Sequence, residues 1–281
     1  MRISSFVLRD RTQSYGVVDG RHVHDAGDRL RAKYPDLKAL IAADAVGALA
    51  TADGETMALT DVEMLPTIPK ADKIICIGLN YLGHIEETGR DRPEYPSIFT
   101  RFPASLVGHG QSMIRPTVSE MFDFEGELAV VIGKSGRAIP KEKALDHVAG
   151  YTCFNDGSIR DFQRHTTQFW GGKNFDRSGA MGPWMVTSDE FGDPTKPTMV
   201  TRLNGEVMQS TSVGDLAFPI PYLISYVSTI TELVPGDIIA TGTPSGVGAF
   251  RNPKVFMKPG DKIEVEISGI GTLSNNIVDE E

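Results

Sequence analysis

Cysteine is nearly absent from this chain: its 281 residues include two, Cys76 and Cys153, and both lie in apolar segments. Two such thiols do not make the disulfide framework of a small secreted domain, and we expect them to be buried hydrophobes in a reducing compartment. No apolar run approaches the roughly 18 residues of a membrane-spanning helix, and residues 1–6 lack the apolar core of a signal peptide. The sequence therefore predicts a cytoplasmic protein that does not cross a membrane.

Positive charge is also scarce. Lys and Arg together number 28 against 37 Asp and Glu, which gives a formal net charge of −9. Nucleic acids and anionic membranes are bound by basic faces, so this balance argues against both kinds of partner. A small anionic substrate would need a locally positive pocket instead, and Arg160 and Lys173 are its natural suppliers.

The chain divides into two parts of different character. Residues 1–65 combine strand-like segments with an Ala/Leu-rich helix over 37–49, which predicts a small N-terminal α/β domain. A linker at 66–69 follows, because each of its two prolines restricts the backbone to extended conformations. Residues 71–281 show short strands punctuated by Gly and Pro with few helices, which indicates a β-rich α+β domain.

An acidic row at Asp123, Glu125 and Glu127 precedes an apolar, β-branched run over 128–133 that predicts a buried strand. Because side chains alternate along a strand, the three carboxylates share one face. They repel one another and are costly to bury unless a cation joins them. Oxygen ligands suit Mg²⁺, Mn²⁺ or Ca²⁺ better than zinc. The alternative is an exposed strand edge whose acids face water.

Three later segments place polar groups where strands end. Asp156 follows an apolar segment, at an element end of the kind that often carries ligands or catalytic groups. Lys173 comes directly after two glycines, where backbone and ammonium can both approach an anion. The Gly/Thr-rich loop over 241–248 offers backbone N–H groups and hydroxyls that can hold a carboxylate.

Residues 82–89 predict one or two helical turns that end at Gly89. Positions three apart share a helix face, so His84 and Glu87 can form a hydrogen bond. A carboxylate that orients an imidazole and stabilises its charged form makes a general base near neutral pH. Glu86 is the rival partner, and an incidental surface pair is the alternative.

Taken in order, these segments resemble the fumarylacetoacetate hydrolase (FAH) family over residues 71–281. The motifs are Gly78-x-Asn80-Tyr81 with His84, Glu125-x-Glu127-Leu128, Asn155-Asp156 with Arg160-Asp161-x-x-Gln163, Gly172-Lys173-x-Phe175-Asp176 with Gly182-Pro183-Trp184, and Thr241-Gly242-Thr243-Pro244-x-Gly246-Val247-Gly248. Each motif alone is weak, but five in this order are specific. The resemblance implies an FAH-type mixed β-roll catalytic domain that binds Mg²⁺ or Mn²⁺, with Ca²⁺ as a further candidate. It also implies a homodimer and a lid over 82–96.

Residue roles follow from the motifs and the resemblance together. The expected metal ligands are Glu125, Glu127 and Asp156. The expected catalytic residues are His84, Glu87 and Lys173. The expected substrate-binding residues are Arg160, Gln163, Thr243 and Arg101. Arg101 stands where many relatives have a lysine near the pocket mouth, and an arginine there would grip a second substrate carboxylate bidentately.

The leading functional prediction is metal-dependent hydrolysis of a C–C bond in acylpyruvate-like or other 2,4-diketo acids, by a water that His84 activates. An oxaloacetate-type decarboxylase or a 2-hydroxy-diene-dioate isomerase on the same scaffold is the alternative, because decarboxylation needs the same stabilised enolate without the attacking water. The second alternative is a non-catalytic protein that binds an oxo-acid.

Overall fold

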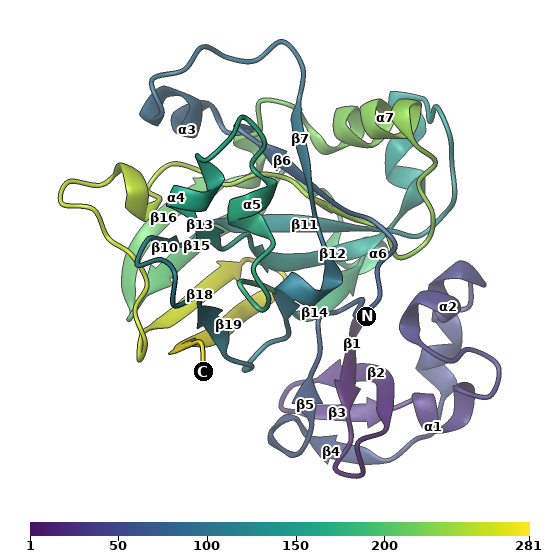
Figure 1. The fold of residues 1–281 in the computed structure, drawn as a ribbon. Coiled ribbons are helices and arrows are strands. Elements are labelled where there is room, and N and C mark those ends of the chain that lie inside the picture. Colours follow the sequence, from purple (N-terminus) through teal and green to yellow (C-terminus); the bar gives the residue numbers. More distant parts are fainter.

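One mixed sheet of 12 strands runs through both parts of the chain in the computed structural model, which describes residues 1–281 (Figure 1). Along its path lie β4 (Thr56–Ala58), β3 (His22–Asp25), β2 (Gln13–Asp19), β1 (Arg2–Val7), β14 (Gly179–Thr187), β12 (Val148–Asn155), β11 (Gly126–Ile132), β17 (Ile238–Ala240), β6 (Ile74–Gly78) and β7 (Ser97–Arg101). Two short strands lie off this path, β5 (Glu63–Met64) beside β1 and β8 (Leu106–Val107) beside β14. The predicted β-rich α+β class is confirmed.

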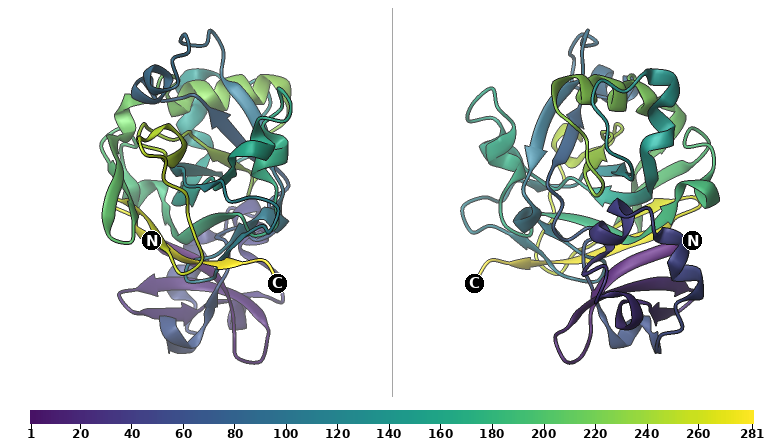
Figure 2. Two further views of the ribbon diagram at one scale, coloured as in Figure 1. Left: turned by 60° about the vertical axis from the view of Figure 1, so that its left-hand side comes forward. Right: turned by 90° about the vertical axis from the view of Figure 1, so that its right-hand side faces the viewer.

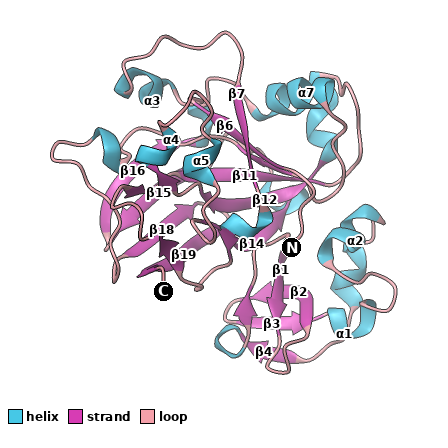
Figure 3. Cartoon of the chain, viewed as in Figure 1, coloured by secondary structure: helices cyan, strands magenta, loops and turns pink.

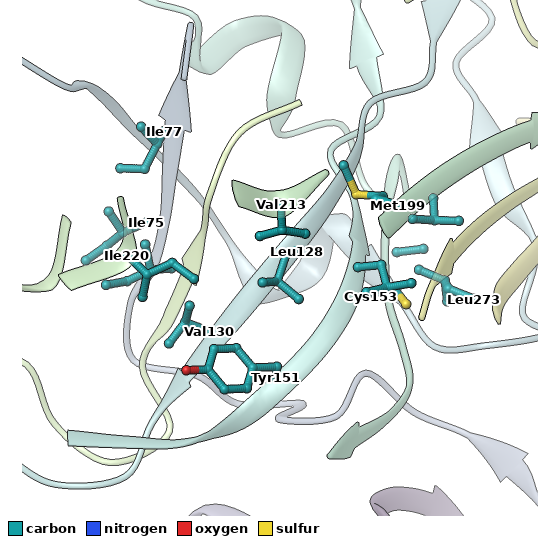
Figure 4. Close-up of a cluster of buried hydrophobic side chains, with 14 of the residues drawn as sticks. Ile75, Ile77, Leu128, Val130, Tyr151, Cys153, Met199, Val213, Ile220 and Leu273 are labelled. Atoms are coloured by element: carbon teal, nitrogen blue, oxygen red, sulfur yellow. The ribbon is translucent and has the colours of Figure 1, made fainter. Parts of the chain in front are cut away.

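A second sheet of five strands packs against the first. Its order is β16 (Glu206–Ser212), β15 (Thr198–Leu203), β18 (Lys262–Ile267), β19 (Gly271–Asp279) and β9 (Met113–Arg115). A two-stranded ribbon of β10 (Phe122–Asp123) and β13 (Ser158–Ile159) completes the β-structure. Apolar side chains from both sheets meet in the largest core cluster, where Leu128 and Cys153 face Met199 and Leu273 (Figure 4).

Strand β11 is buried along its whole length. Leu128 and Val130 belong to the core cluster between the two sheets. Ala129 and Val131 belong to a second cluster, which also contains Leu37 from the N-terminal part. A strand with both faces covered reads as a continuous apolar run, which is why the run over 128–133 predicts this strand correctly.

The helices are short and lie around the sheets (Figure 3). They are α1 (Gly27–Leu30), α2 (Leu37–Ala42), α3 (Leu82–Glu87), α4 (Arg160–Gln163), α5 (Trp170–Lys173), α6 (Ser188–Phe191) and α7 (Ile220–Ile230). The predicted helix over 37–49 is interrupted, because Asp44 takes a φ of 52° and Val46–Thr51 continue as a 3₁₀ helix. None of these helices has the length and apolar character needed to cross a bilayer.

The N-terminal residues form a lobe that continues the large sheet, and two further views show it on one side of the molecule (Figure 2). Strands β1 and β2 form an antiparallel hairpin in which Ile3 faces Val17. Strand β1 also pairs with β14, with Arg2 opposite Val186. The lobe therefore shares one hydrogen-bonded sheet with the rest of the chain.

Both cysteines are free and fully buried, as predicted. Burial raises the pKa of the Cys76 thiol well above its ordinary value and that of Cys153 to about 12. Both thiols are therefore neutral side chains of the core.

Candidate active site

Three carboxylates converge where β11 begins and the neighbouring strand β12 ends. Glu127 lies on β11, Glu125 lies directly before that strand, and Asp156 directly follows β12. The pairing of β11 with β12 places Gly126 opposite Asn155, and the Asp156 N–H donates to the Glu125 carbonyl at 2.8 Å. One carboxylate oxygen from each residue lies within 4.8 Å of the other two, and all three side chains are buried. The structure thus brings the three predicted metal ligands together.

Of the three carboxylates, Glu127 has the fewest partners that stabilise its negative charge. Its Oε2 accepts a hydrogen bond from the Gly242 N–H at 2.8 Å, and it forms no ion pair. Burial, with Asp156 and Glu125 beside it, raises the pKa of Glu127 well above its ordinary value. Burial also acts to raise the pKa of Glu125, but Lys173 and Arg160 outweigh it and lower that pKa to about 2. Glu127 is the carboxylate that most needs a further cation.

Lys173 reaches the triad from α5. Its Nζ donates to Glu125 Oε2 at 2.7 Å and to Asp156 Oδ2 at 2.6 Å, and its side chain is 1% exposed. Burial opposes the charged form, but Asp156 and Glu125 outweigh this effect and raise the pKa of Lys173. The ammonium is therefore charged and fixed inside the site.

Arg160 lies at the start of α4 and is held by two acids. Its Nε donates to Asp123 Oδ2 at 2.8 Å and its Nη1 to Glu125 Oε1 at 2.6 Å. Its Nη2 is buried and has no hydrogen-bond partner. Asp123, the first acid of the row, binds this guanidinium and the N–H groups of Gly248 and Ala249, and it lies outside the triad. The unpartnered Nη2 is a buried donor that is available to a ligand.

The predicted position of Arg101 is wrong. Its side chain is fully buried behind Asp156, and Arg101 is not among the residues that line the cavity. Its Nη1 donates to Asp156 Oδ1 at 2.7 Å and to the Gly157 carbonyl at 2.9 Å. Its other N–H groups bond Ser105 and Ser178. The side chain points to the inner face of β7, so Arg101 positions Asp156 and has no donor left for a substrate.

His84 and Glu87 form the expected pair on α3. His84 Nδ1 lies 2.9 Å from Glu87 Oε2, and the other carboxylate oxygen of Glu87 accepts from the Gly246 N–H at 2.9 Å. His84 lines the cavity, and its Nε2 makes no hydrogen bond. Glu87 therefore orients the imidazole and also joins α3 to the loop over 241–248. Glu86 is exposed and takes no part in this pair.

Thr243 and Gln163 complete the predicted set. The Thr243 hydroxyl donates to the Gly126 carbonyl at 3.0 Å and accepts from Gln209 Nε2 at 2.8 Å. Gln163 accepts from Arg160 Nη1 at 3.0 Å through Oε1, which leaves its amide N–H groups without a partner. Both residues line the cavity, but of the two only Gln163 has N–H groups that are free to donate to a ligand.

A cavity of about 260 Å³ opens above the triad. Its walls contain Ile77, Gly78, Leu79, His84, Thr88, Arg90, Phe99, Glu125, Glu127, Arg160, Gln163, Arg164, Phe169, Lys173, Thr243 and Phe250. Arg90 and Arg164 line the cavity although no motif indicated them, and the sequence also did not indicate Gln209, which bonds Thr243. Gln209 lies in β16 next to Met208, and the two arginines stand in polar segments, all without a recognisable motif.

The donor set fits a hard divalent cation. The triad, one further buried acid and three buried bases carry one formal negative charge in total; these residues are Glu125, Glu127, Asp156, Asp123, Arg101, Arg160 and Lys173. Three carboxylate ligands without sulfur or imidazole favour Mg²⁺ or Mn²⁺. A divalent ion would relieve the repulsion at Glu127 and give the site a net positive charge, which suits an anionic ligand.

Known proteins resemble this chain both in sequence and in fold. The fumarylacetoacetate (FAA) hydrolase C-terminal family matches residues 73–278. Oxaloacetate tautomerase YisK from Bacillus subtilis is 48% identical over 223 residues, which cover 78% of this chain and 74% of that protein. Among solved structures, 5-carboxymethyl-2-hydroxymuconate delta-isomerase from Mycobacterium smegmatis aligns with a TM-score of 0.80 and 31% identity, with 100% of both chains covered. Maleylpyruvate hydrolase from Sphingobium sp. SYK-6, in complex with manganese(II) and pyruvate, aligns with a TM-score of 0.84 and 28% identity, again over 100% of both chains.

Proposed function

Since the chain belongs to the fumarylacetoacetate hydrolase family, we propose that it is an enzyme that interconverts the oxo and enol forms of a short 2-oxo acid such as oxaloacetate. The observation that carries this proposal is that His84, oriented by Glu87, lines the same cavity as Glu125 and Glu127 of the carboxylate triad. Enolisation needs a positioned base and cationic groups that stabilise charge on the carbonyl oxygen, and His84 and Lys173 in one cavity wall can supply these two functions.

The relatives favour this reaction over the hydrolysis that leads the sequence-based predictions. Proteins named as oxaloacetate tautomerases are 48% and 43% identical to this chain, whereas the maleylpyruvate hydrolase is 28% identical. Tautomerisation belongs with the predicted decarboxylase and isomerase alternatives, because all three pass through an enolate. It needs no attacking water.

His84 acts as the general base in this proposal. Its free Nε2 takes a proton from C3 of the substrate, and the electrons of that C–H bond form the C2–C3 double bond. Glu87 stabilises the imidazolium that results and keeps the ring in place, because its second oxygen is fixed by Gly246. The C2=O π electrons move onto the oxygen, the His84 imidazolium returns its proton to that oxygen to complete the enol, and the reverse sequence restores the oxo form.

Charge develops on the C2 oxygen, and fixed cations surround that position. A divalent ion held by Glu125, Glu127 and Asp156 would polarise the 2-oxo group and stabilise the enolate. Lys173 adds a buried ammonium beside the same carboxylates. The free Nη2 of Arg160 supplies a donor for the adjacent substrate carboxylate. The Gln163 amide is a second donor in the same wall.

The proposal is tested by following oxaloacetate with the purified protein in Mn²⁺ or Mg²⁺. We expect faster loss of the enol form and faster exchange of the C3 hydrogens with D₂O, without equal release of pyruvate and CO₂. Stoichiometric pyruvate and CO₂ would establish the decarboxylase instead. Pyruvate with a free acid from acylpyruvates would establish the hydrolase. Tight binding of oxaloacetate with no exchange would point to the non-catalytic oxo-acid-binding protein.

A further inference from the structure

We propose that Asp123 is a positioning residue that holds both sides of the site: the guanidinium of Arg160, and the turn over residues 246–250 that contacts the base His84. This inference rests on the proposed function, which gives Arg160 and His84 their roles toward the substrate. It adds a buried acid that lies outside the carboxylate triad and does not line the cavity.

Both carboxylate oxygens of Asp123 are fully occupied by donors of the chain. The side chain lies on β10 and is 0% exposed. Its Oδ1 accepts from the backbone N–H of Phe124 at 2.9 Å and of Gly248 at 2.8 Å. Its Oδ2 accepts from the Ala249 N–H at 2.9 Å and from Arg160 Nε at 2.8 Å. Since a carboxylate accepts about four hydrogen bonds, Asp123 acts only through the groups that it holds.

The first of these groups is the guanidinium of Arg160. Arg160 directly follows β13, and the pairing of β13 with β10 places Asp123 opposite Ser158. Asp123 binds Nε, while Nη1 donates to Glu125 and Gln163. Contacts at two nitrogens fix the plane of the guanidinium and therefore the direction of the free Nη2. Without Asp123 only the contacts at Nη1 remain, and the plane can turn about them.

The second group is the backbone of the turn over 246–250. Gly248 and Ala249 donate to Asp123, and a Cβ at Gly248 would lie 2.7 Å from Asp123 Oδ1, an approach that only glycine permits. Phe250 follows in the same turn and lines the cavity. Its ring packs edge-on against the His84 ring, with centroids 6.0 Å apart and an interplanar angle of 75°. This contact restricts rotation of the imidazole.

The turn contacts the base pair at both of its ends. Gly246 donates to Glu87, which holds His84 Nδ1, and Phe250 packs on the ring of His84. Asp123 binds the middle of the turn, between these two contacts. The position of the base and the direction of the free arginine donor therefore depend on the same carboxylate.

A purely structural role is the competing explanation, because a buried carboxylate that accepts backbone N–H groups stabilises any loop. Asp237 provides the comparison. Its side chain is 0% exposed, it accepts from the N–H groups of Lys73 at 3.2 Å and Val234 at 2.8 Å, and it pairs with the Lys73 ammonium at 2.8 Å. Asp237 has the same kinds of partner as Asp123 but does not contact any residue of the cavity wall through them.

The main variant is Asp123→Asn. In either orientation of the amide, its NH₂ group faces one of the two N–H groups of the turn, and Arg160 loses its anionic partner. Asp123→Ser is the second variant, because it sets no amide N–H against these donors if the Asn variant does not fold. Asp237→Asn is the matched control.

The test uses the full-length proteins in saturating Mg²⁺, at a temperature at which thermal unfolding shows each to be folded. Calorimetry gives the dissociation constant of oxamate, a 2-oxo acid analogue without C3 hydrogens, which reports on the arginine side. NMR gives the rate of C3 exchange at saturating oxaloacetate, which reports on the base. The ¹H signals of the His84 ring, which the ring current of Phe250 shifts, report on the turn without any turnover.

We expect each Asp123 variant to weaken oxamate binding about tenfold and to slow C3 exchange about tenfold, as for the loss of one hydrogen bond to a charged group. The His84 signals should move in both variants. Asp237→Asn should lower the Tm and leave all three measurements unchanged.

Three results would overturn the inference: a loss of stability alone in the Asp123 variants, a loss in only one of oxamate binding and exchange, or equal changes in Asp237→Asn. Failure of the proposed function has a different signature. No C3 exchange in the unmodified protein, with weaker oxamate binding and moved His84 signals in the variants, would support the role of Asp123 and overturn the proposed tautomerase.

Discussion

Arg101 and Asp156 form an ion pair in which both side chains are fully buried, with Nη1 2.7 Å from Oδ1. The contact fixes one oxygen of Asp156 and leaves Oδ2 on the side of Lys173 and the triad. Its neighbour Gly179 leaves room for the guanidinium, because a Cβ there would lie 2.7 Å from Arg101 Nη2. One carboxylate of the triad is thus oriented from behind by a residue that does not line the cavity.

Substitution Arg101→Lys should weaken Mn²⁺ binding about tenfold, because lysine keeps the charge but loses the planar fork that orients Asp156. A Mn²⁺ titration of the variant and the unmodified protein measures the effect. Arg202→Lys, which affects a half-exposed pair with Glu266 on the second sheet, is the control and should bind Mn²⁺ normally. Equal Mn²⁺ affinity in all three proteins would show that Arg101 does not position the ligand.

Substitution His84→Gln should reduce the proposed C3 exchange by about 10²- to 10⁴-fold, which is the usual contribution of a positioned base. Mn²⁺ affinity should stay unchanged, because His84 is not one of the three converging carboxylates. Proton exchange is followed by NMR and metal binding by titration. Exchange at the normal rate in this variant would remove His84 from the mechanism.

Substitution Glu127→Gln should stabilise the metal-free protein by about 1 kcal/mol, because it removes a buried carboxylate beside Asp156 and Glu125. Thermal unfolding in EDTA measures this gain. Saturating Mn²⁺ should raise the Tm of the unmodified protein by mass action but leave the variant unchanged. A lower Tm for the variant in EDTA would contradict the repulsion at this position.

Substitution Gly246→Ala should destabilise the protein by about 3 kcal/mol. Gly246 has a φ of +99°, and a Cβ would lie 2.2 Å from the Met208 carbonyl oxygen. Gly260→Ala is the matched control, because its φ of +90° carries the same backbone strain and nothing lies within 4 Å of the added atom. Urea unfolding compares the two, and equal losses would mean that the close approach to Met208 has no cost.

Stability should fall between pH 7 and pH 5 through His109. Burial, with Lys262 nearby, lowers the pKa of His109 below its ordinary 6.5, and its Nδ1 accepts a hydrogen bond from the Ser274 N–H at 3.1 Å. Because the folded-state pKa lies below the unfolded one, the contribution is present above pH 6.5 and is lost as the pH falls through the folded value.

Urea unfolding at several pH values measures this dependence for the unmodified protein and for His109→Asn. The variant should show a flatter profile over the same range. Replacement of the exposed His22 by Gln is the control and should leave the profile as it is. Identical profiles for the His109 variant and the unmodified protein would exclude His109 as the cause.

The convergence of the carboxylate triad could be predicted from the sequence because it depends on local geometry. A continuous apolar, β-branched run indicated a buried strand, and Glu125 and Glu127 lie two residues apart at its beginning. Asp156 could be placed in the same way, since it directly follows the neighbouring strand. His84 and Glu87 needed one helical turn and nothing else.

The remaining errors concern tertiary contacts. The segment over 37–49 is rich in Ala and Leu, but Asp44 adopts a left-handed backbone with a φ of 52°, which interrupts the helix. Arg101 lies at the end of an edge strand, and the sequence does not reveal which face of that strand is covered. Arg90 and Arg164 come together only through folding, so no spacing in the sequence indicates them.

The pairing of β1 with β14 has a consequence for how this protein can be altered. Removing the first 65 residues would strip the hydrogen-bonded neighbour from Met185 and Val186, two fully buried residues of β14. An exposed, apolar strand edge has unpaired backbone N–H and C=O groups, with which strands of other chains can pair. Truncated forms should therefore self-associate. Any exchange of this lobe between relatives has to preserve the strand pairing that Arg2 and Ile3 make with β14.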